Sequence, residues 1–511
     1  MKRQPYPVVQ LTGGLDVGVD ATFLVDRNSP NLKEARFDKG LIKKEFEWID
    51  FGTVGAGALP LDSDVMAMPT FNMYDGSSIS LAVTQTKIYK YVTGGTFTDI
   101  TGTTPLTGDL DNRISSVSTL NGVGADIFLL TNGKDIMQAW SGTGDFADWG
   151  GTATIIAKCL TVFKSRLIMG HTVESGVSCT KRIRWTVAGD VEDDAGAGSG
   201  FVDIADAEGN FVCFALLKDK LFLIFEKSIW ELVYVGGTRI FDPQLRVSGF
   251  GSYSPDGVVA ADGKAYIYGN TSIATYDGLD VVPIDQQVHP LFYLTEHKII
   301  NSSMAQRAAM AYSDEAQEIW LAVCTHGSTV PDKLFKYNLL YNSWILYERE
   351  ATSFGAYLSA SGGSWLDEST TIWSARTGVW KEVAFPSGSG VPLIGLSNGY
   401  IKQDDRSTYG TRQFEFESKD WMFGHATRVV EFRVQARLGA FTITYSIDEG
   451  ATFLGGRSFA AQSEFTEFSY PVNFTAQKVR VRIVSSSSQM EIKWIEPWHI
   501  PRKRSSTLQM S

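Results

Sequence analysis

Residues 211–285 read FVCFALLKDKLFLIFEKSIWELVYVGGTRIFDPQLRVSGFGSYSPDGVVAADGKAYIYGNTSIATYDGLDVVPID and carry the most regular pattern in the chain. Apolar runs of about five residues alternate with turn pairs, and runs this short have the length of strands rather than helices. The runs are 213–217, 221–225, 229–234, 258–261, 265–268 and 273–276, and the pairs are Lys218-Asp219, Glu226-Lys227, Gly236-Gly237, Asp262-Gly263, Gly269-Asn270 and Asp277-Gly278. Asp-Gly and Gly-Asn pairs tolerate the positive φ of tight hairpins. The stretch therefore predicts antiparallel four-stranded sheets.

Similar groups of short strands recur on both sides of this stretch, which predicts an all-β chain with a β-propeller of about seven blades. We expect residues 1–55 to form an N-terminal arm with ring-closing strands and residues 56–390 to form the propeller. Residues 391–500 are predicted to be a β-sandwich platform, and residues 501–511 a basic and polar tail. A first strand that pairs into the last blade would remove an exposed sheet edge. A weak helical pattern occurs only at 290–304.

The predicted sandwich has the cleanest alternation of apolar and polar residues in the chain. Val430, Phe432, Val434, Ala436 and Leu438 alternate with polar residues, which predicts a strand with one buried and one solvated face. The outward positions include five basic residues, Arg433, Arg437, Arg480, Arg482 and Lys493. A solvated surface is one interpretation of this basic face, and a docking surface for an acidic partner or for nucleic acid is another.

The 511-residue chain carries a net charge of −11, unevenly distributed. Residues 51–409 hold 25 basic and 39 acidic side chains, a net charge of −14, whereas residues 410–511 have a net charge of +3. An acidic propeller region argues against tight binding of nucleic acid but is compatible with DNA that slides past. The N-terminus has a basic start without an apolar stretch, and no apolar run reaches 18 residues, so we expect neither a secretory signal nor a membrane span.

No catalytic, cofactor or metal motif is evident. Gly395-Leu396-Ser397-Asn398-Gly399 matches G-x-S-x-G, but Asn398-Gly399 predicts a hairpin turn instead of the strand-to-helix turn of a nucleophile elbow. The segment from Asp190 to Asp194 is acidic but lacks the pattern of an EF-hand. The four cysteines and six histidines show no ligand spacing. We therefore expect no enzymatic activity, no cofactor and no bound metal.

Ser446-Ile447-Asp448-Glu449-Gly450-Ala451-Thr452-Phe453 resembles the Asp-box of sialidases. In that motif the aspartate accepts hydrogen bonds from its own turn. A sialidase would also need several boxes, three arginines and a tyrosine nucleophile. Asp448 and Gly450 are therefore predicted to be structural turn residues.

Three segments resemble the tail nozzle, or tail hub, propeller proteins of short-tailed bacteriophages. They are the arm from Gly13-Gly14-Leu15 to Gly40-Leu41-Ile42, the blades at 216–284 and the start of the platform at 421–437. This resemblance implies a virion protein assembled in the host cytoplasm as a ring of six copies. DNA would pass through the ring without specific binding, and the ring would contact a tail adaptor and tail fibres or spikes. The alternative is a glycan-binding or glycan-cleaving propeller, which a cluster of carboxylates and arginines at one mouth of the propeller would favour.

Overall fold

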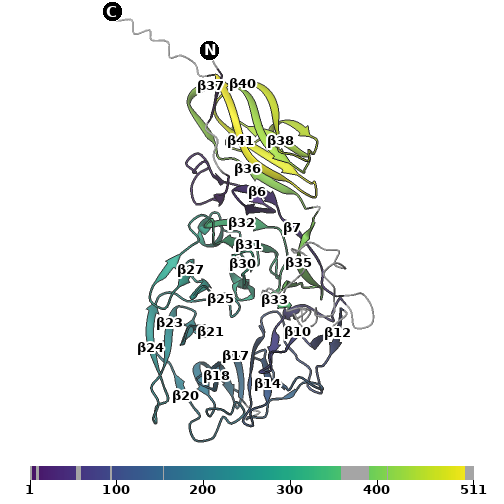
Figure 1. Ribbon diagram of the computed structural model, residues 1–511. Helices are drawn as coiled ribbons and strands as arrows, with labels where there is room; N and C mark the ends of the chain where they lie inside the picture. The colour runs from purple at the N-terminus through teal and green to yellow at the C-terminus, as the bar shows by residue number, and fades with distance from the viewer. Residues whose placement is uncertain are drawn as a thin grey trace, which may run out of the picture.

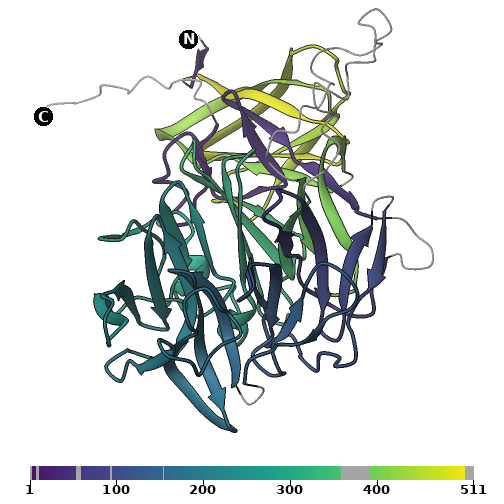
Figure 2. The same ribbon diagram turned by 60° about the horizontal axis from the view of Figure 1, so that its bottom comes forward.

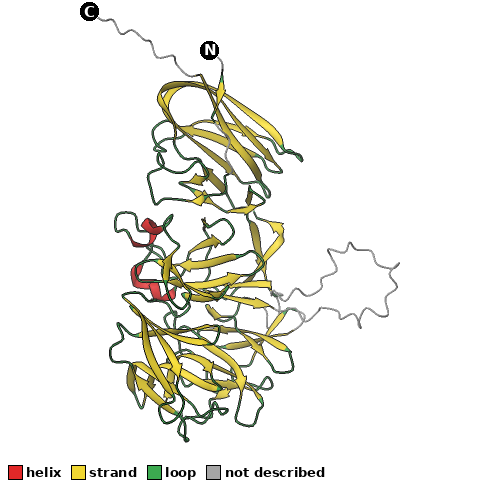
Figure 3. Ribbon diagram, turned by 60° about the vertical axis from the view of Figure 1, so that its left-hand side comes forward, coloured by secondary structure: helices red, strands yellow, loops and turns green. Residues whose placement is uncertain are grey.

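The computed structural model describes residues 3–6, 11–52, 59–92, 95–152, 155–357, 391–410 and 412–500. Strands dominate these residues, as Figures 1 and 3 show. The helices in the described ranges are the five-residue α1 (His289–Tyr293) and the six-residue 3-10 helix η1 (Ser302–Arg307). Neither is long and apolar enough to cross a membrane. The prediction of an all-β chain is confirmed.

The strands from β8 to β35 form groups of four or five around a ring (Figure 2). The first group consists of β8 (Val65–Ala67), β9 (Thr70–Asn72), β10 (Ser78–Thr84), β11 (Ile88–Val92) and β12 (Thr96–Asp99). The second consists of β13 (Ser115–Leu120), β14 (Asp126–Thr131), β15 (Gln138–Trp140) and β16 (Ala147–Asp148). The third consists of β17 (Ile155–Phe163), β18 (Arg166–Glu174), β19 (Val177–Trp185) and β20 (Gly200–Asp203). The next two are β21 (Phe211–Leu217), β22 (Lys220–Phe225), β23 (Ser228–Tyr234) and β24 (Phe241–Ser248); and β25 (Val258–Ala261), β26 (Lys264–Tyr268), β27 (Ile273–Tyr276) and β28 (Val281–Pro283).

The ring continues through two further groups. They are β29 (Ala309–Ser313), β30 (Glu318–Val323), β31 (Lys333–Asn338) and β32 (Ser343–Tyr347), and then β33 (Ser353–Tyr357), β34 (Val391–Gly395) and β35 (Ile401–Tyr409) with β7 (Phe46–Asp50). Strand β29 contacts β25 on one side and β33 on the other. The strands β29–β32 also continue into a sheet of sixteen strands. The structure thus has a propeller with six separate blades among the described residues, and the predicted count of about seven is not confirmed, because β29–β32 belong to the sixteen-stranded sheet.

The start of the chain closes the propeller. Strand β7 pairs antiparallel with β35, with Trp48 opposite Asp404. Because β34 and β35 belong to this last blade, residues 391–410 lie with the propeller and not with the C-terminal unit, which corrects the predicted boundary at 391. Residues 358–390 of the predicted propeller lie outside the described residues.

The rest of the N-terminal segment pairs with strands of both the propeller and the C-terminal unit of the same chain. Its strands are β1 (Gln4–Pro5), β2 (Gly14–Leu15), β3 (Asn28–Ser29), β4 (Leu32–Lys33), β5 (Ala35–Asp38) and β6 (Leu41–Lys44). Leu15 is opposite Trp344 of the propeller, whereas Leu32 is opposite Phe416 and Ile42 opposite Ile492 of the C-terminal unit. This segment therefore joins the two halves of the molecule, in addition to supplying β7, the strand that closes the propeller.

The C-terminal unit is one folded-over sheet. Its strands are β36 (Phe414–Glu417), β37 (Trp421–Arg437), β38 (Phe441–Ser446), β39 (Leu454–Phe459), β40 (Thr466–Ser485) and β41 (Glu491–Ile500). The first half of β40 pairs with β37 and its second half with β36 and β38, so β37 and β38 face each other across a core. The rings of Phe432 and Tyr445 lie 5.7 Å apart there. A separate two-sheet sandwich is not confirmed, because hydrogen bonding is continuous from this unit into β29–β32.

Candidate functional site

The cavity at the propeller axis is lined mainly by apolar side chains. It has a volume of about 260 Å³ and takes residues from several blades, including Met66, Ile114, Met310 and Phe354. Asp256 is the carboxylate among its lining residues, and the Nε atom of the buried Arg113 donates to it over 2.6 Å. A glycoside hydrolase requires two carboxylates beside the scissile bond. This central cavity does not supply that pair.

A second cavity of about 230 Å³ gathers charged residues from distant parts of the chain. It lies where β5, β7, β30, β31 and β35 meet. Its charged lining residues are Arg36, Asp38, Glu45, Glu315, Glu318, Lys336 and Asp404. This set, called the acidic cavity below, is a cluster of carboxylates and basic groups on the side of the propeller that faces the C-terminal unit.

Lys336 lies between two carboxylates of the acidic cavity. Its ammonium nitrogen is 3.2 Å from Glu45 and 3.9 Å from Glu318, and all three side chains are at least nine-tenths buried. Burial opposes the charged form of Glu45, but Lys336 and Arg349 outweigh it and lower the pKa of this carboxyl to about 2. Burial, assisted by the charge of Glu45, instead raises the pKa of Glu318. The two carboxyl groups therefore differ in proton affinity.

The same charged network extends toward the N-terminal segment. The guanidinium of Arg349 donates to Glu34 over 2.7 Å, and both side chains are buried. The Tyr347 hydroxyl donates to Glu45 over 2.8 Å. Since Glu34 precedes β5 and Arg349 follows β32, these bonds fasten the N-terminal segment to the propeller.

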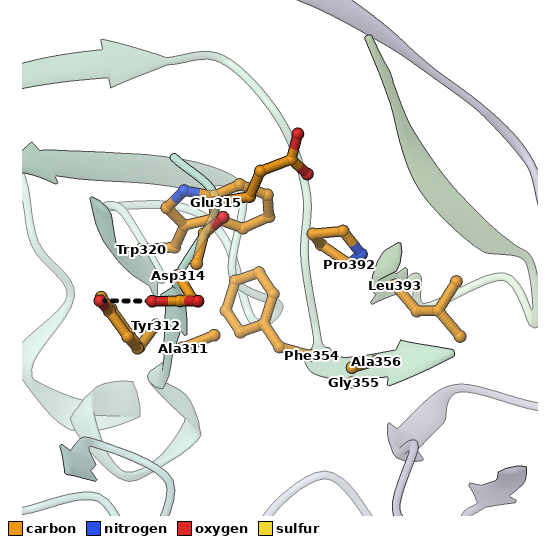
Figure 4. A pocket seen from close by; sticks show the side chains of 11 residues that line it. Ala311, Tyr312, Asp314, Glu315, Trp320, Phe354, Gly355, Ala356, Pro392 and Leu393 are labelled. Atoms are coloured by element: carbon orange, nitrogen blue, oxygen red, sulfur yellow. Dashed lines mark hydrogen bonds between the residues drawn. The ribbon is translucent and has the colours of Figure 1, made fainter. Parts of the chain in front are cut away.

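An aromatic cavity of about 240 Å³ adjoins the acidic one and shares Glu315 with it. Figure 4 shows Trp320 and Phe354 side by side in its wall, with Pro392 and Leu393 across from them. The two rings lie 6.0 Å apart at 66°. Tyr312 donates its hydroxyl proton to Asp314 over 3.2 Å at the rim. Aromatic faces beside carboxylates form a surface suited to a polar ligand with apolar patches.

The five predicted docking residues do not form one basic face. Arg433, Arg437 and Lys493 belong to β37 and β41, whereas Arg480 and Arg482 lie on the second half of β40 beside β36. Each arginine is paired with carboxylates. The pairs are Arg433 with Glu431 and Glu467, Arg437 with Glu491, Arg480 with Glu417 and Asp420, and Arg482 with Glu415 and Glu417. The alternating strand has a bulge between Val429 and Glu431, but Phe432, Val434 and Ala436 are buried as predicted.

Asp448 and Gly450 form the turn between β38 and β39. Asp448 accepts hydrogen bonds from the Ser446 hydroxyl over 2.6 Å and from the Thr452 amide over 2.9 Å, and these bonds lower its pKa to about 2. Gly450 has a φ of +89°, and a Cβ there would lie 2.3 Å from Arg480. Both residues hold the turn, in agreement with the Asp-box pattern.

The remaining candidates from the sequence are Ser397 and the acidic segment from Asp190 to Asp194, and both lie in the surroundings of structural residues. Ser397 lies in the hairpin between β34 and β35, and no helix follows it, so it is not a nucleophile elbow. Asp194 is buried and accepts from Thr152 and Arg184. No group of three potential ligands with metal-binding geometry occurs in the described ranges. Sequence reasoning missed the acidic cavity because its residues come from positions up to 368 apart with no local motif.

Comparisons with known proteins identify no family for the chain. No family model and no curated protein matches it. A solved exo-beta-1,3-galactanase from Phanerochaete chrysosporium is similar at 10% identity with a TM-score of 0.28, covering 88% of this chain and 100% of that one. The extracellular domain of a putative one component system from B. thetaiotaomicron is similar at 8% identity with a TM-score of 0.41, covering 89% of this chain and 62% of that one. A glycoside hydrolase family 43 arabinoxylan arabinofuranohydrolase from Bacillus subtilis is similar at 10% identity with a TM-score of 0.23, covering 95% of this chain and 98% of that one.

The prediction that the chain has no enzymatic activity is corrected, because glycoside hydrolases are among the solved structures to which the chain is similar. That prediction rested on the absence of a catalytic motif, and a missing local motif does not exclude catalysis. At these identities and TM-scores the likeness transfers neither a substrate nor a catalytic residue to this chain.

Proposed function

We propose that the chain is a structural subunit of a short-tailed bacteriophage tail, built as a ring of copies below the head. The observation that carries this proposal is the N-terminal segment 11–50. It contains one of the three segments that resemble tail nozzle proteins, and it bonds the propeller and the C-terminal unit into one body.

The DNA channel of this assembly would lie between subunits. The cavity at the propeller axis holds about 260 Å³, far too little for a duplex. Head-to-tail contacts close into a ring when their rotation is a whole fraction of a turn. The net charge of −14 at residues 51–409 would give the lumen a negative lining that repels the DNA backbone. DNA would then pass without specific binding, while other surfaces meet the adaptor and the fibres or spikes.

Light scattering after size exclusion tests this proposal on the full-length chain. A mass several times 56.2 kDa, independent of added DNA, is expected for a ring. Fluorescence anisotropy with a labelled 30-base-pair duplex should show no binding at 150 mM salt. A monomer at all concentrations, including in the presence of virion tail extract, would contradict the proposal.

A second function, binding or cleavage of a glycan, is favoured by the acidic cavity. Two carboxyl groups with divergent proton affinities are the requirement for acid and base roles in glycoside hydrolysis. Glu45, with its lowered pKa, would be the ionised member, and Glu318, with its raised pKa, the proton donor. The adjoining aromatic cavity would hold a sugar ring against Phe354, which is partly exposed.

Release of reducing sugar from galactan, arabinoxylan and bacterial surface polysaccharide tests this second function. Glu318→Gln should abolish any release, because the amide cannot donate a carboxyl proton. Asp314→Asn, at the rim of the neighbouring cavity, is the control and should retain it. Release that survives Glu318→Gln would exclude the acidic cavity as the site of cleavage.

A further inference from the structure

The largest of the cavities described lies at a different place, beside the two short helices. Its volume is about 480 Å³, within the range of small-ligand sites. Its walls come from the loop after β24, the β26–β27 turn, and the helices α1 and η1. The two helices are drawn red in Figure 3. The lining residues with polar groups include Glu226, Asn270, Lys298, Ser302 and Gln306. It shares no lining residue with the acidic or aromatic cavity.

Three tyrosines line this cavity, and they differ in how their hydroxyl groups are used. Tyr293 donates to the carbonyl oxygen of Gly269 over 2.8 Å. Tyr268 is 4% exposed as a whole residue, and no hydrogen bond joins its hydroxyl to a residue that the structure describes. Tyr253 is 41% exposed and likewise has no described partner for its hydroxyl. The Tyr268 hydroxyl is not among the fully buried polar atoms that lack a partner, so it is open to the cavity and can bond to a ligand there.

The surroundings keep the buried tyrosines neutral. Burial raises the pKa of Tyr268 and that of Tyr293 far above the usual value. Tyr268 therefore keeps a hydroxyl proton to donate to a ligand across the physiological pH range, whereas the proton of Tyr293 is already donated to Gly269. The ring of Tyr268 is fixed edge-on against Phe292, with centroids 6.0 Å apart, so its hydroxyl has a defined direction.

We propose that this tyrosine-lined cavity binds a saccharide unit. Its lining joins aromatic rings with neutral hydroxyl and amide groups, and its one lysine is balanced by one glutamate. A ligand of net zero charge with many hydroxyl groups and apolar C–H faces complements such a lining, because sugar C–H faces pack on rings while hydroxyl groups donate and accept. The inference does not depend on ring assembly or on cleavage at the acidic cavity.

A trisaccharide panel tests the proposal on the full-length chain, with saturation-transfer NMR and calorimetry as readouts. The probes are cellotriose, maltotriose, galactotriose and chitotriose. At least one is expected to bind, and Tyr268→Phe should weaken it about fivefold, the scale of one neutral hydrogen bond. Tyr253→Ala should weaken it further by removing an aromatic face. Tyr268→Phe should not lower the melting temperature, since it removes only a hydroxyl that has no described partner.

Tyr276→Phe is the matched control. Tyr276 lies on the neighbouring strand β27, and its buried hydroxyl also has no partner in the described ranges, but it does not line the cavity. Its substitution should leave binding unchanged. Absence of binding by all four trisaccharides, or equal affinity in Tyr268→Phe and wild type, would overturn the proposal. Loss of binding with intact ring assembly would leave the tail proposal untouched.

Discussion

The ammonium nitrogen of Lys336 lies 3.2 Å from a carboxylate oxygen of Glu45, with both side chains buried. Lys336 belongs to β31 of the propeller, and Glu45 precedes β7, the strand that closes it. The pair thus joins the start of the chain to a blade built from residues nearly 300 positions later. Removal of one partner from a buried pair leaves an uncompensated charge, so this contact is a sensitive probe of the closure.

Lys336→Met is expected to lower the free energy of unfolding by about 3–5 kcal/mol, because Glu45 would remain buried without its lysine. Urea denaturation followed by tryptophan fluorescence measures this. Lys333→Met, which removes a partly exposed partner of Glu348, is the control and should change stability by less than about 1 kcal/mol. The double variant Lys336→Met with Glu45→Gln should recover part of the loss. Equal effects of the two single lysine substitutions would contradict the buried pair.

Acid should destabilise the protein through Glu45. Its pKa is lowered to about 2 in the folded chain, so its contribution is complete above the ordinary value near 4.5 and is lost as the pH falls toward 2. Glu318 acts in the opposite direction, since its raised pKa favours the protonated folded form at low pH. Melting temperatures between pH 2 and 7 should therefore fall less steeply on the acid side in Glu45→Gln than in wild type. An unchanged acid slope would show that Glu45 does not carry this dependence.

Deletion of residues 1–50 should prevent correct folding. The deletion removes β7 and exposes the edge of β35, and it also removes β2, β4 and β6 from between the two halves. Circular dichroism and size exclusion should show loss of the cooperative transition and aggregation. Deletion of residues 1–3 alone, which leaves these strands in place, is the control. A monomeric, cooperatively folding chain without residues 1–50 would disprove closure by β7.

Asp448→Ala should lower the melting temperature slightly, because the Thr452 amide and the Ser446 hydroxyl lose their acceptor. Asp448→Asn keeps one acceptor oxygen and should lie between Asp448→Ala and wild type. The exposed turn is remote from the acidic cavity, so Glu318→Gln and Asp448→Ala should have additive effects on stability. A melting temperature of Asp448→Ala equal to that of wild type would mean that the turn does not depend on this carboxylate.

Local patterns in the sequence were sufficient for the individual strands. The apolar run at 273–276 coincides with β27, and the Asp262-Gly263 pair lies at the β25–β26 turn, with Asp262 at a φ of +51°. The sequence did not predict the bulge after Val429, since the bulge depends on pairing with both β40 and β41. The sequence did not predict the acidic cavity either. Glu45, Glu318 and Asp404 have ordinary neighbours in sequence and meet only because β7 closes the ring.

Electron microscopy of the assembled tail tests the central proposal most directly. The proposal predicts a closed ring, of six copies by resemblance to tail nozzle proteins, with DNA passing between subunits through a lumen lined mainly by acidic residues of the 51–409 region. Single copies placed on the outside of the tail, or a lumen lined mainly by Lys and Arg, would contradict it.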